Sequence, residues 1–162
     1  MEIEEYDELR PTFLLARKGM YWGIISSDRS RRVLLPFEYD EMSWFGQYIL
    51  LKKNGKYGLW EQYELTDSPD EIKEKGIVLP CIADDICYNE DLYHDIYRIN
   101  GKVGLVAPHT DAIYDYFFID NEYDLDIIGA VKDGKSGYLD KACNFCEPVQ
   151  SLKRKGIYLS TW

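Results

Sequence analysis

Asn54-Gly55-Lys56-Tyr57-Gly58-Leu59 is a short motif that recurs along this chain and decides its fold. Three copies place a turn dipeptide, Asn-Gly or Asp-Gly, between two apolar-rich segments. These dipeptides favour two-residue hairpin turns, because both central residues need a positive φ angle. Four copies therefore predict four antiparallel β-hairpins. The other copies are the looser Lys18-Gly19-Met20-Tyr21-Trp22-Gly23, then Asn100-Gly101-Lys102-Val103-Gly104-Leu105 and Asp133-Gly134-Lys135-Ser136-Gly137-Tyr138.

A second recurring element lies between the hairpin motifs and contains a proline. Leu35-Pro36-Phe37-Glu38-Tyr39-Asp40 matches Leu79-Pro80-Cys81-Ile82-Ala83-Asp84, and Ala112-Ile113-Tyr114-Asp115 is a fainter copy. Proline suits the end or edge of a strand because it donates no hydrogen bond to the sheet. The second glycine of each hairpin motif is predicted to mark a β-bulge or a close approach of a neighbouring backbone.

These two elements together resemble the bacterial WG repeat, which is named for a Trp-Gly pair. The resemblance covers roughly residues 13–149, and Trp22-Gly23 keeps the literal pair. Tyr57, Val103 and Ser136 stand at the tryptophan position in the other copies. The resemblance implies antiparallel β-hairpins stacked side by side, with binding roles more often than catalysis, and it assigns no catalytic residue.

The predicted fold is therefore all-β, with about four stacked antiparallel hairpin repeats and one short inserted helix. We expect a single β-repeat domain over residues 1–162, with repeats near 13–46, 47–92, 93–125 and 126–150 and a C-terminal segment at 151–162. The helix is predicted at 69–75. Ser68 as N-cap, Pro69 at the first helical position and Glu71 form a capping box, and Gly76 ends the helix.

Composition limits the cellular location that the sequence predicts. Residues 1–5 are acidic and lack the basic and apolar regions of a secretory signal. No run of apolar residues reaches the length of a membrane span. We therefore expect a cytoplasmic protein whose four cysteines are reduced.

The acidic residues are concentrated in one part of the sequence. Residues 84–126 hold eleven acidic and two basic side chains, a net charge of −9 out of −10 for the whole chain. Such a field repels nucleic acid and anionic lipid and attracts cationic partners. Solubility alone is the alternative reading of this charge. The basic clusters Arg29–Arg32 and Lys153–Lys155 are too short, and too outweighed, to predict nucleic-acid binding.

The candidate site is a surface of carboxylates and tyrosines for a basic protein partner. Tyrosine offers rigid contact area and the carboxylates offer charge complementarity. Acids stand at every second position of residues 120–126. A strand there would align four carboxylates on one face, where basic side chains of a partner could bind them. The alternative is that these carboxylates lie on a solvated sheet face or in a loop. Tyr88 and Tyr97 are also expected to be exposed. The predicted partner-binding residues are Asp84, Asp85, Glu90, Asp91, Tyr93, Asp95, Tyr114, Asp115, Tyr116, Asp120, Glu122, Tyr123, Asp124 and Asp126.

No metal, cofactor or catalytic site is predicted. The segment from Asp120 lacks the glycine and glutamate that an EF-hand calcium loop needs at its sixth and twelfth positions. The two histidines, His94 and His109, are expected in surface or capping roles, and no nucleophile motif surrounds any serine or cysteine. Buried thiols are expected for the cysteines, with a zinc site built from all four as the alternative. These cysteines are Cys81, Cys87, Cys143 and Cys146.

These features predict a non-enzymatic protein-binding module. The most specific form of the prediction is an acidic immunity protein that neutralises a basic toxin domain, since nucleases act on polyanions and are commonly basic. The alternative is a structural or scaffold WG-repeat protein with no toxin partner.

Overall fold

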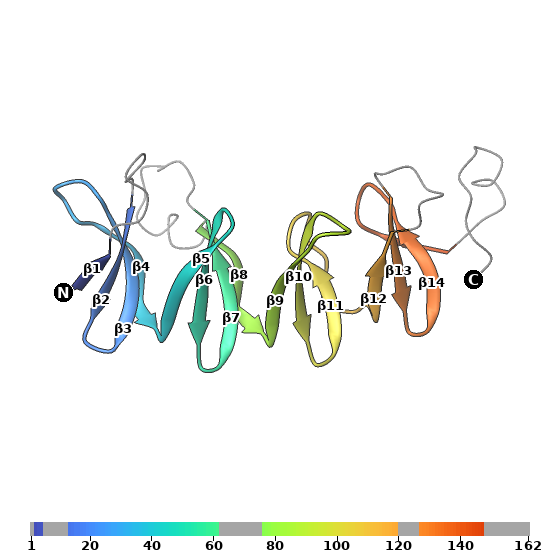
Figure 1. Cartoon of the computed structure of the whole chain (residues 1–162), viewed down its shortest axis with the longest axis horizontal. Coiled ribbons are helices and arrows are strands. Elements are labelled where there is room, and N and C mark those ends of the chain that lie inside the picture. Colours follow the sequence, from blue (N-terminus) through green and yellow to red (C-terminus); the bar gives the residue numbers. More distant parts are fainter. Residues whose placement is uncertain (1, 5–12, 62–75, 120–126, 148–162) are drawn as a thin grey trace. The chain divides into compact units, whose positions relative to one another are not determined.

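The computed structural model describes residues 2–4, 13–61, 76–119 and 127–147, and it is all-β. The chain divides into two compact units, which we call unit 1 (Met1–Ala83) and unit 2 (Asp84–Trp162). Each unit holds two antiparallel sheets in which the strands follow one another in chain order (Figure 1). The predicted fold class is confirmed.

Unit 1 contains the first two sheets. The first sheet has the order β1-β2-β3-β4 and the second has the order β5-β6-β7-β8. All neighbouring strands in both sheets pair antiparallel. The strands are β1 (Glu2–Glu4), β2 (Phe13–Lys18), β3 (Tyr21–Ser26), β4 (Val33–Tyr39), β5 (Glu41–Phe45), β6 (Tyr48–Lys53), β7 (Lys56–Trp60) and β8 (Ile77–Ala83).

Unit 2 contains the other two sheets, with the orders β11-β10-β9 and β12-β13-β14-β15. An isolated bridge between Val103 of β11 and Tyr114 lies where a fourth strand would extend the β9–β11 sheet. The strands are β9 (Asp85–Asn89), β10 (His94–Ile99), β11 (Lys102–Leu105), β12 (Tyr116–Phe118), β13 (Ile128–Lys132), β14 (Lys135–Leu139) and β15 (Phe145–Cys146).

The four motifs form two-residue hairpin turns, as the sequence predicts. Asn54, Asn100 and Asp133 have φ angles of 53°, 50° and 50°, and the glycine after each also has a positive φ. Two positive φ angles define a type I′ turn, whose twist matches that of the flanking strands. In the looser first copy only Gly19 has a positive φ, which is the pattern of a type II′ turn.

The second glycine of the motif faces the backbone of the following strand. A Cβ on Gly58 would lie 2.6 Å from Leu79 O and 2.9 Å from Cys81 N. The pairing of β7 with β8 shifts register at this point, between Tyr57 and Leu59. The predicted bulge and close approach are therefore confirmed at this glycine.

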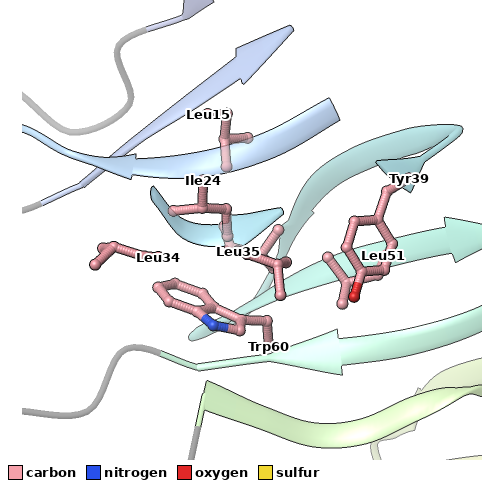
Figure 2. Close-up of a cluster of buried hydrophobic side chains, with 8 residues drawn as sticks. Leu15, Ile24, Leu34, Leu35, Tyr39, Leu51 and Trp60 are labelled. Atoms are coloured by element: carbon pink, nitrogen blue, oxygen red, sulfur yellow. The ribbon is translucent and has the colours of Figure 1, made fainter. Parts of the chain in front are cut away.

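Each unit has its own apolar core, to which both of its sheets contribute. In unit 1, Leu15, Ile24 and Leu35 of the first sheet pack with Leu51 and Trp60 of the second (Figure 2). In unit 2, residues of β10 and β11 pack with residues of β13 and β14. Fully burying one such side chain contributes about 2 kcal/mol. The unit 2 core consists of Leu92, Ile96, Val103, Leu105, Tyr114, Ala130 and Leu139.

The sheets divide the chain at different points from the expected repeat boundaries. One sheet ends and the next begins at Asp40, Asp84 and Asp115, rather than at 46, 92 and 125. The strand after each aspartate pairs with the hairpin that follows it, so it belongs to the next sheet. The helix expected at 69–75 lies outside the described residues.

Candidate functional site

Three aspartates at the sheet junctions have the same structural role. The backbone N–H of Asp84 donates to Arg98 O at 2.8 Å, and its carboxylate accepts from the N–H of Asn100 at 2.8 Å. Asp40 repeats both bonds: its N–H donates to Lys52 O, and its carboxylate accepts from the N–H of Asn54. Each carboxylate therefore satisfies a backbone donor of the next hairpin turn, which would otherwise be an unpaired polar group.

Asp115 repeats this arrangement and adds an ion pair. Its N–H donates to Val131 O at 2.7 Å, and its carboxylate accepts from the N–H of Gly134 and from the Lys102 ammonium. The bond from Lys102 is the main cause of the lowered pKa of Asp115, and the bond from Gly134 adds to it. Asp84 and Asp115 were predicted to bind a partner, but their carboxylates hold hairpin turns.

Tyr114 and Tyr97 are also part of the fold. The predicted exposure of both side chains is wrong, since only 3% of Tyr114 and 2% of Tyr97 is accessible. Tyr97 donates its hydroxyl hydrogen to Thr110 O at 2.6 Å, and Tyr114 packs against Phe117. Sequence alone places these tyrosines in an acidic stretch without showing which side of the sheet they occupy.

The turn between β9 and β10, residues 90–93, combines exposed carboxylates with an exposed tyrosine, and we call it the acidic turn. Tyr93 is 79% exposed, and Glu90 and Asp91 are exposed beside it. Within the described ranges, neither carboxylate has an ion-pair partner. Leu92 is 4% exposed and anchors the turn in the core of unit 2.

Two hydrogen bonds hold the acidic turn in one conformation. The N–H of Leu92 donates to Asn89 Oδ1 at 2.9 Å, and Nδ1 of His94 lies 2.6 Å from Leu92 O. Because a carbonyl oxygen can only accept, Nδ1 of His94 must hold the proton. Tyr93 has a φ of 54°, a left-handed conformation that costs a non-glycine residue about 1 kcal/mol. The turn therefore presents Tyr93 at a cost in backbone strain.

The equivalent turn of unit 1 shows that this strain is not required by the repeat. There β5 and β6 are joined by only two residues, Gly46 and Gln47, and glycine takes the positive φ. In unit 2 the pairing of Asn89 with His94 leaves four residues in the turn. The longer turn thus adds two acidic residues and a strained tyrosine to a common frame.

The neighbouring surface of β9 and β10 supplies further predicted residues. Tyr88 of β9 is 51% exposed, and Asp95 lies opposite it on β10. Burial raises the pKa of Asp95. Asp85 lies opposite Arg98 and accepts a hydrogen bond from the N–H of Ile86.

The other predicted residues divide into two groups. Tyr116, on β12, is 55% exposed as expected. The alternating acidic segment lies outside the described residues, so its predicted strand or loop remains a prediction. That segment contains Asp120, Glu122, Tyr123, Asp124 and Asp126.

Unit 2 also contains a cavity of about 250 Å³ that is lined by both apolar and polar side chains. The polar groups in its wall are His94, Asp140, Lys141 and Cys143. Asp140 accepts from the N–H groups of Ala142 and Asn144, both at 2.9 Å, and these bonds, that of Asn144 first, lower its pKa. The carboxylate therefore holds its own loop together.

The four cysteines and His109 are the remaining candidate groups, and Cys143 lies in the wall of this cavity. All four cysteines are free thiols, but their expected burial is wrong, since Cys87 is exposed and the other three are half-buried. Partial burial raises the pKa of Cys81 and Cys87. The part of the chain that the structure describes contains no cluster of three or more side chains suited to holding a metal ion. His109 stacks on Tyr97 and lies 3.8 Å from Asp111, in a shallow hollow of about 410 Å³.

Within the described ranges, no helix has the length and apolar character that crossing a bilayer requires. Searches against protein-family models, curated proteins and solved structures find no match to this chain.

Proposed function

We infer that this chain is a non-enzymatic, cytoplasmic protein-binding module, and most specifically an acidic immunity protein that neutralises a basic toxin domain. The observation that supports this function best is the acidic turn, in which Glu90, Asp91 and Tyr93 are exposed together. The equivalent turn of unit 1, between β5 and β6, has a glycine at the positive φ and contains no acidic residue. The extra residues are therefore explained by recognition better than by folding.

The charge of unit 2 fits a cationic partner. Residues 84–126 have a net charge of −9, and unpaired carboxylates at the acidic turn would meet such a partner first. Complementary charge raises the association rate and excludes partners of the same sign. At physiological salt this attraction acts over about 8 Å, so it should weaken as salt is added.

The exposed tyrosines supply the contact area that charge alone does not. Tyr93, Tyr88 and Tyr116 are each more than half exposed. A tyrosine that becomes buried at the centre of an interface often contributes about 2 kcal/mol or more, which is about thirtyfold in affinity. Tyr93 has the most to bury, and its turn is already fixed by Asn89 and Leu92, so little conformational entropy is lost on binding.

A structural or scaffold role for a WG-repeat protein is the second candidate. It is favoured by Asp84 and Asp115, since part of the acidity serves hairpin turns and not a partner. In that case the remaining charge would serve solvation. A toxin gene immediately beside the gene for this chain would favour immunity, and a housekeeping operon would favour the scaffold.

The test is capture followed by neutralisation. A tagged form of the chain is used to retain proteins from its native host, and each retained protein is expressed alone and together with the chain. The immunity function predicts a basic protein that stops growth when expressed alone and is harmless when co-expressed. Retained proteins that are neither basic nor toxic would contradict it and favour the scaffold.

A matched pair of variants then assigns the surface. Glu90→Lys with Asp91→Lys should abolish protection, whereas Glu41→Lys, an exposed carboxylate of unit 1, should leave protection intact. Equal protection by both variants would show that the acidic turn is not the binding surface.

A further inference from the structure

The loop between β3 and β4, residues 27–32, concentrates positive charge in a strongly acidic protein, and we call it the arginine loop. Arg29, Arg31 and Arg32 lie within four residues of one another. Arg29 and Arg31 are exposed and Arg32 is half-buried. Among the residues with described positions, none of these three side chains makes an ion pair.

The only acid of the loop is occupied by the loop itself. The carboxylate of Asp28 accepts from the N–H of Ser30 at 2.9 Å, from the hydroxyl of Ser26 at 3.0 Å and from the hydroxyl of Ser30. These bonds are the main causes of its lowered pKa, and the charge of Arg32 adds a smaller contribution. Asp28 is therefore an ionised carboxylate that offsets one of the three positive charges, which leaves a net charge of +2 on residues 27–32.

Hydrogen bonds within the chain also fix the path of the loop. Ser26 is 1% exposed, and its hydroxyl oxygen accepts from the N–H of Arg32 at 2.8 Å. The N–H of Arg31 donates to Asp28 O at 3.2 Å, and Arg31 itself has a φ of 48°. A left-handed arginine costs about 1 kcal/mol relative to residues that favour this conformation.

Unit 2 contains the same loop frame without the arginines. Asp140 accepts from the N–H of Ala142, as Asp28 does from Ser30, and the N–H of Cys143 donates to Asp140 O as that of Arg31 does to Asp28 O. Cys143 has a φ of 62°, matching Arg31. Lys141 is the single cation of this second loop. The frame therefore forms with one basic residue, and the three arginines are not needed to build it.

One atom of the arginine loop lacks a partner where one is expected. Nε of Arg32 is buried and has no hydrogen-bond acceptor. Buried donors are nearly always paired in folded proteins, and an unpaired one destabilises the fold. Two half-buried cations of unit 1 are paired, Lys52 with Glu41 at 3.6 Å and Lys53 with Glu38 at 3.5 Å.

We propose that the arginine loop is a second contact surface, which binds a carboxylate-rich segment of a protein partner. A guanidinium group binds a carboxylate through two parallel hydrogen bonds, and a loop whose path is already fixed loses little entropy on binding. Nucleic acid fits less well, because the chain has a net charge of −10 and residues 27–32 contain no aromatic side chain on which a base could stack. This surface lies in unit 1 and does not depend on the function proposed for the acidic turn.

The test uses a fluorescently labelled peptide of about ten glutamates and measures its anisotropy at about 50 mM salt. Arg29→Gln with Arg32→Gln should weaken peptide binding by about tenfold or more, because two charge-assisted contacts are lost. Lys141→Gln, in the matching loop of unit 2, should leave the affinity unchanged. Equal weakening by both variants, or tighter binding of an oligothymidine of the same charge, would overturn the proposal.

Arg31→Asn separates binding from folding. Asparagine accepts the left-handed conformation more readily than arginine, so this variant should melt at a higher temperature. It should also bind the peptide more weakly, because a guanidinium is removed. A lower melting temperature with unchanged affinity would overturn the proposal, since Arg31 would then serve the fold alone.

Discussion

Gly58→Ala and Gly55→Ala are the same substitution three residues apart in one hairpin, and the structure predicts different costs for them. At Gly58 the new Cβ would lie 2.6 Å from Leu79 O, 2.8 Å from Pro80 C and 2.9 Å from Cys81 N, whereas ordinary Cβ contacts are 3.4–4 Å. All three atoms belong to the backbone, so no side-chain rotation can relieve the contact. At Gly55 no atom lies within 4 Å, and the only obstacle is a φ of 75°.

The magnitudes follow from these two obstacles. Overpacking against fixed atoms costs about 3 kcal/mol, at the upper end of the usual range. Placing alanine in the left-handed region costs about 1 kcal/mol. If the free energy of unfolding falls by about 2 kcal/mol per molar urea, the urea concentration at the unfolding midpoint should fall by about 1.5 M for Gly58→Ala and about 0.5 M for Gly55→Ala.

Urea unfolding followed by tryptophan fluorescence is the assay. Trp22, Trp44 and Trp60, three of the four tryptophans, belong to unit 1, and Trp60 is 2% exposed. Their emission should therefore report the unfolding of the unit in which both glycines lie. Equal shifts for the two variants, or a larger shift for Gly55→Ala, would refute the close approach of backbone at Gly58.

Three further predictions concern unit 2. The pKa of Asp115 is lowered mainly by Lys102, so the stabilisation from its carboxylate is present above the unfolded pKa of 3.8 and is lost as the pH falls through the lower folded pKa. Asp115→Asn should therefore make the unfolding free energy less dependent on pH on the acid side. An unchanged pH dependence between about pH 2 and pH 5 would contradict this. Tyr97→Phe removes the donor to Thr110 O and should cost about 1 kcal/mol in chemical denaturation, so a neutral result would show that this carbonyl finds another donor. Tyr93→Asn should raise the stability of unit 2 by up to about 1 kcal/mol, because asparagine tolerates a φ of 54°, and a loss of stability would mean that Tyr93 packs for the fold.

The hairpins could be predicted from the sequence because their signal is local. Asn54, Asn100 and Asp133 stand before glycines, and all three have the positive φ that a type I′ turn requires. The close approach at Gly58 is also local in origin, since glycine inside a strand has few other uses. The sheet boundaries were harder to predict, because from sequence alone the strand after each junction aspartate could pair with the hairpin before it or with the hairpin after it.

The candidate site could be predicted only in part, because composition shows how many carboxylates are present and not where they point. Asp84 and Asp115 differ from Glu90 and Asp91 through hydrogen bonds to turns 16 and 19 residues further along the chain. The available signal was the aspartate that ends each copy of the proline-containing element, as Asp40 does before Asn54. The orientation of Tyr114 depends on the core of unit 2, which sequence periodicity does not specify in a short segment.

The most direct measurement is the affinity of the captured basic partner for three forms of this chain at low and high salt. Isothermal titration with the unaltered chain should show binding that weakens steadily between about 50 mM and 500 mM salt. Glu90→Lys with Asp91→Lys should bind at least about tenfold more weakly, with a shallower salt dependence, while Glu41→Lys should match the unaltered chain. Equal affinity and equal salt dependence in all three forms would contradict the role of the acidic turn.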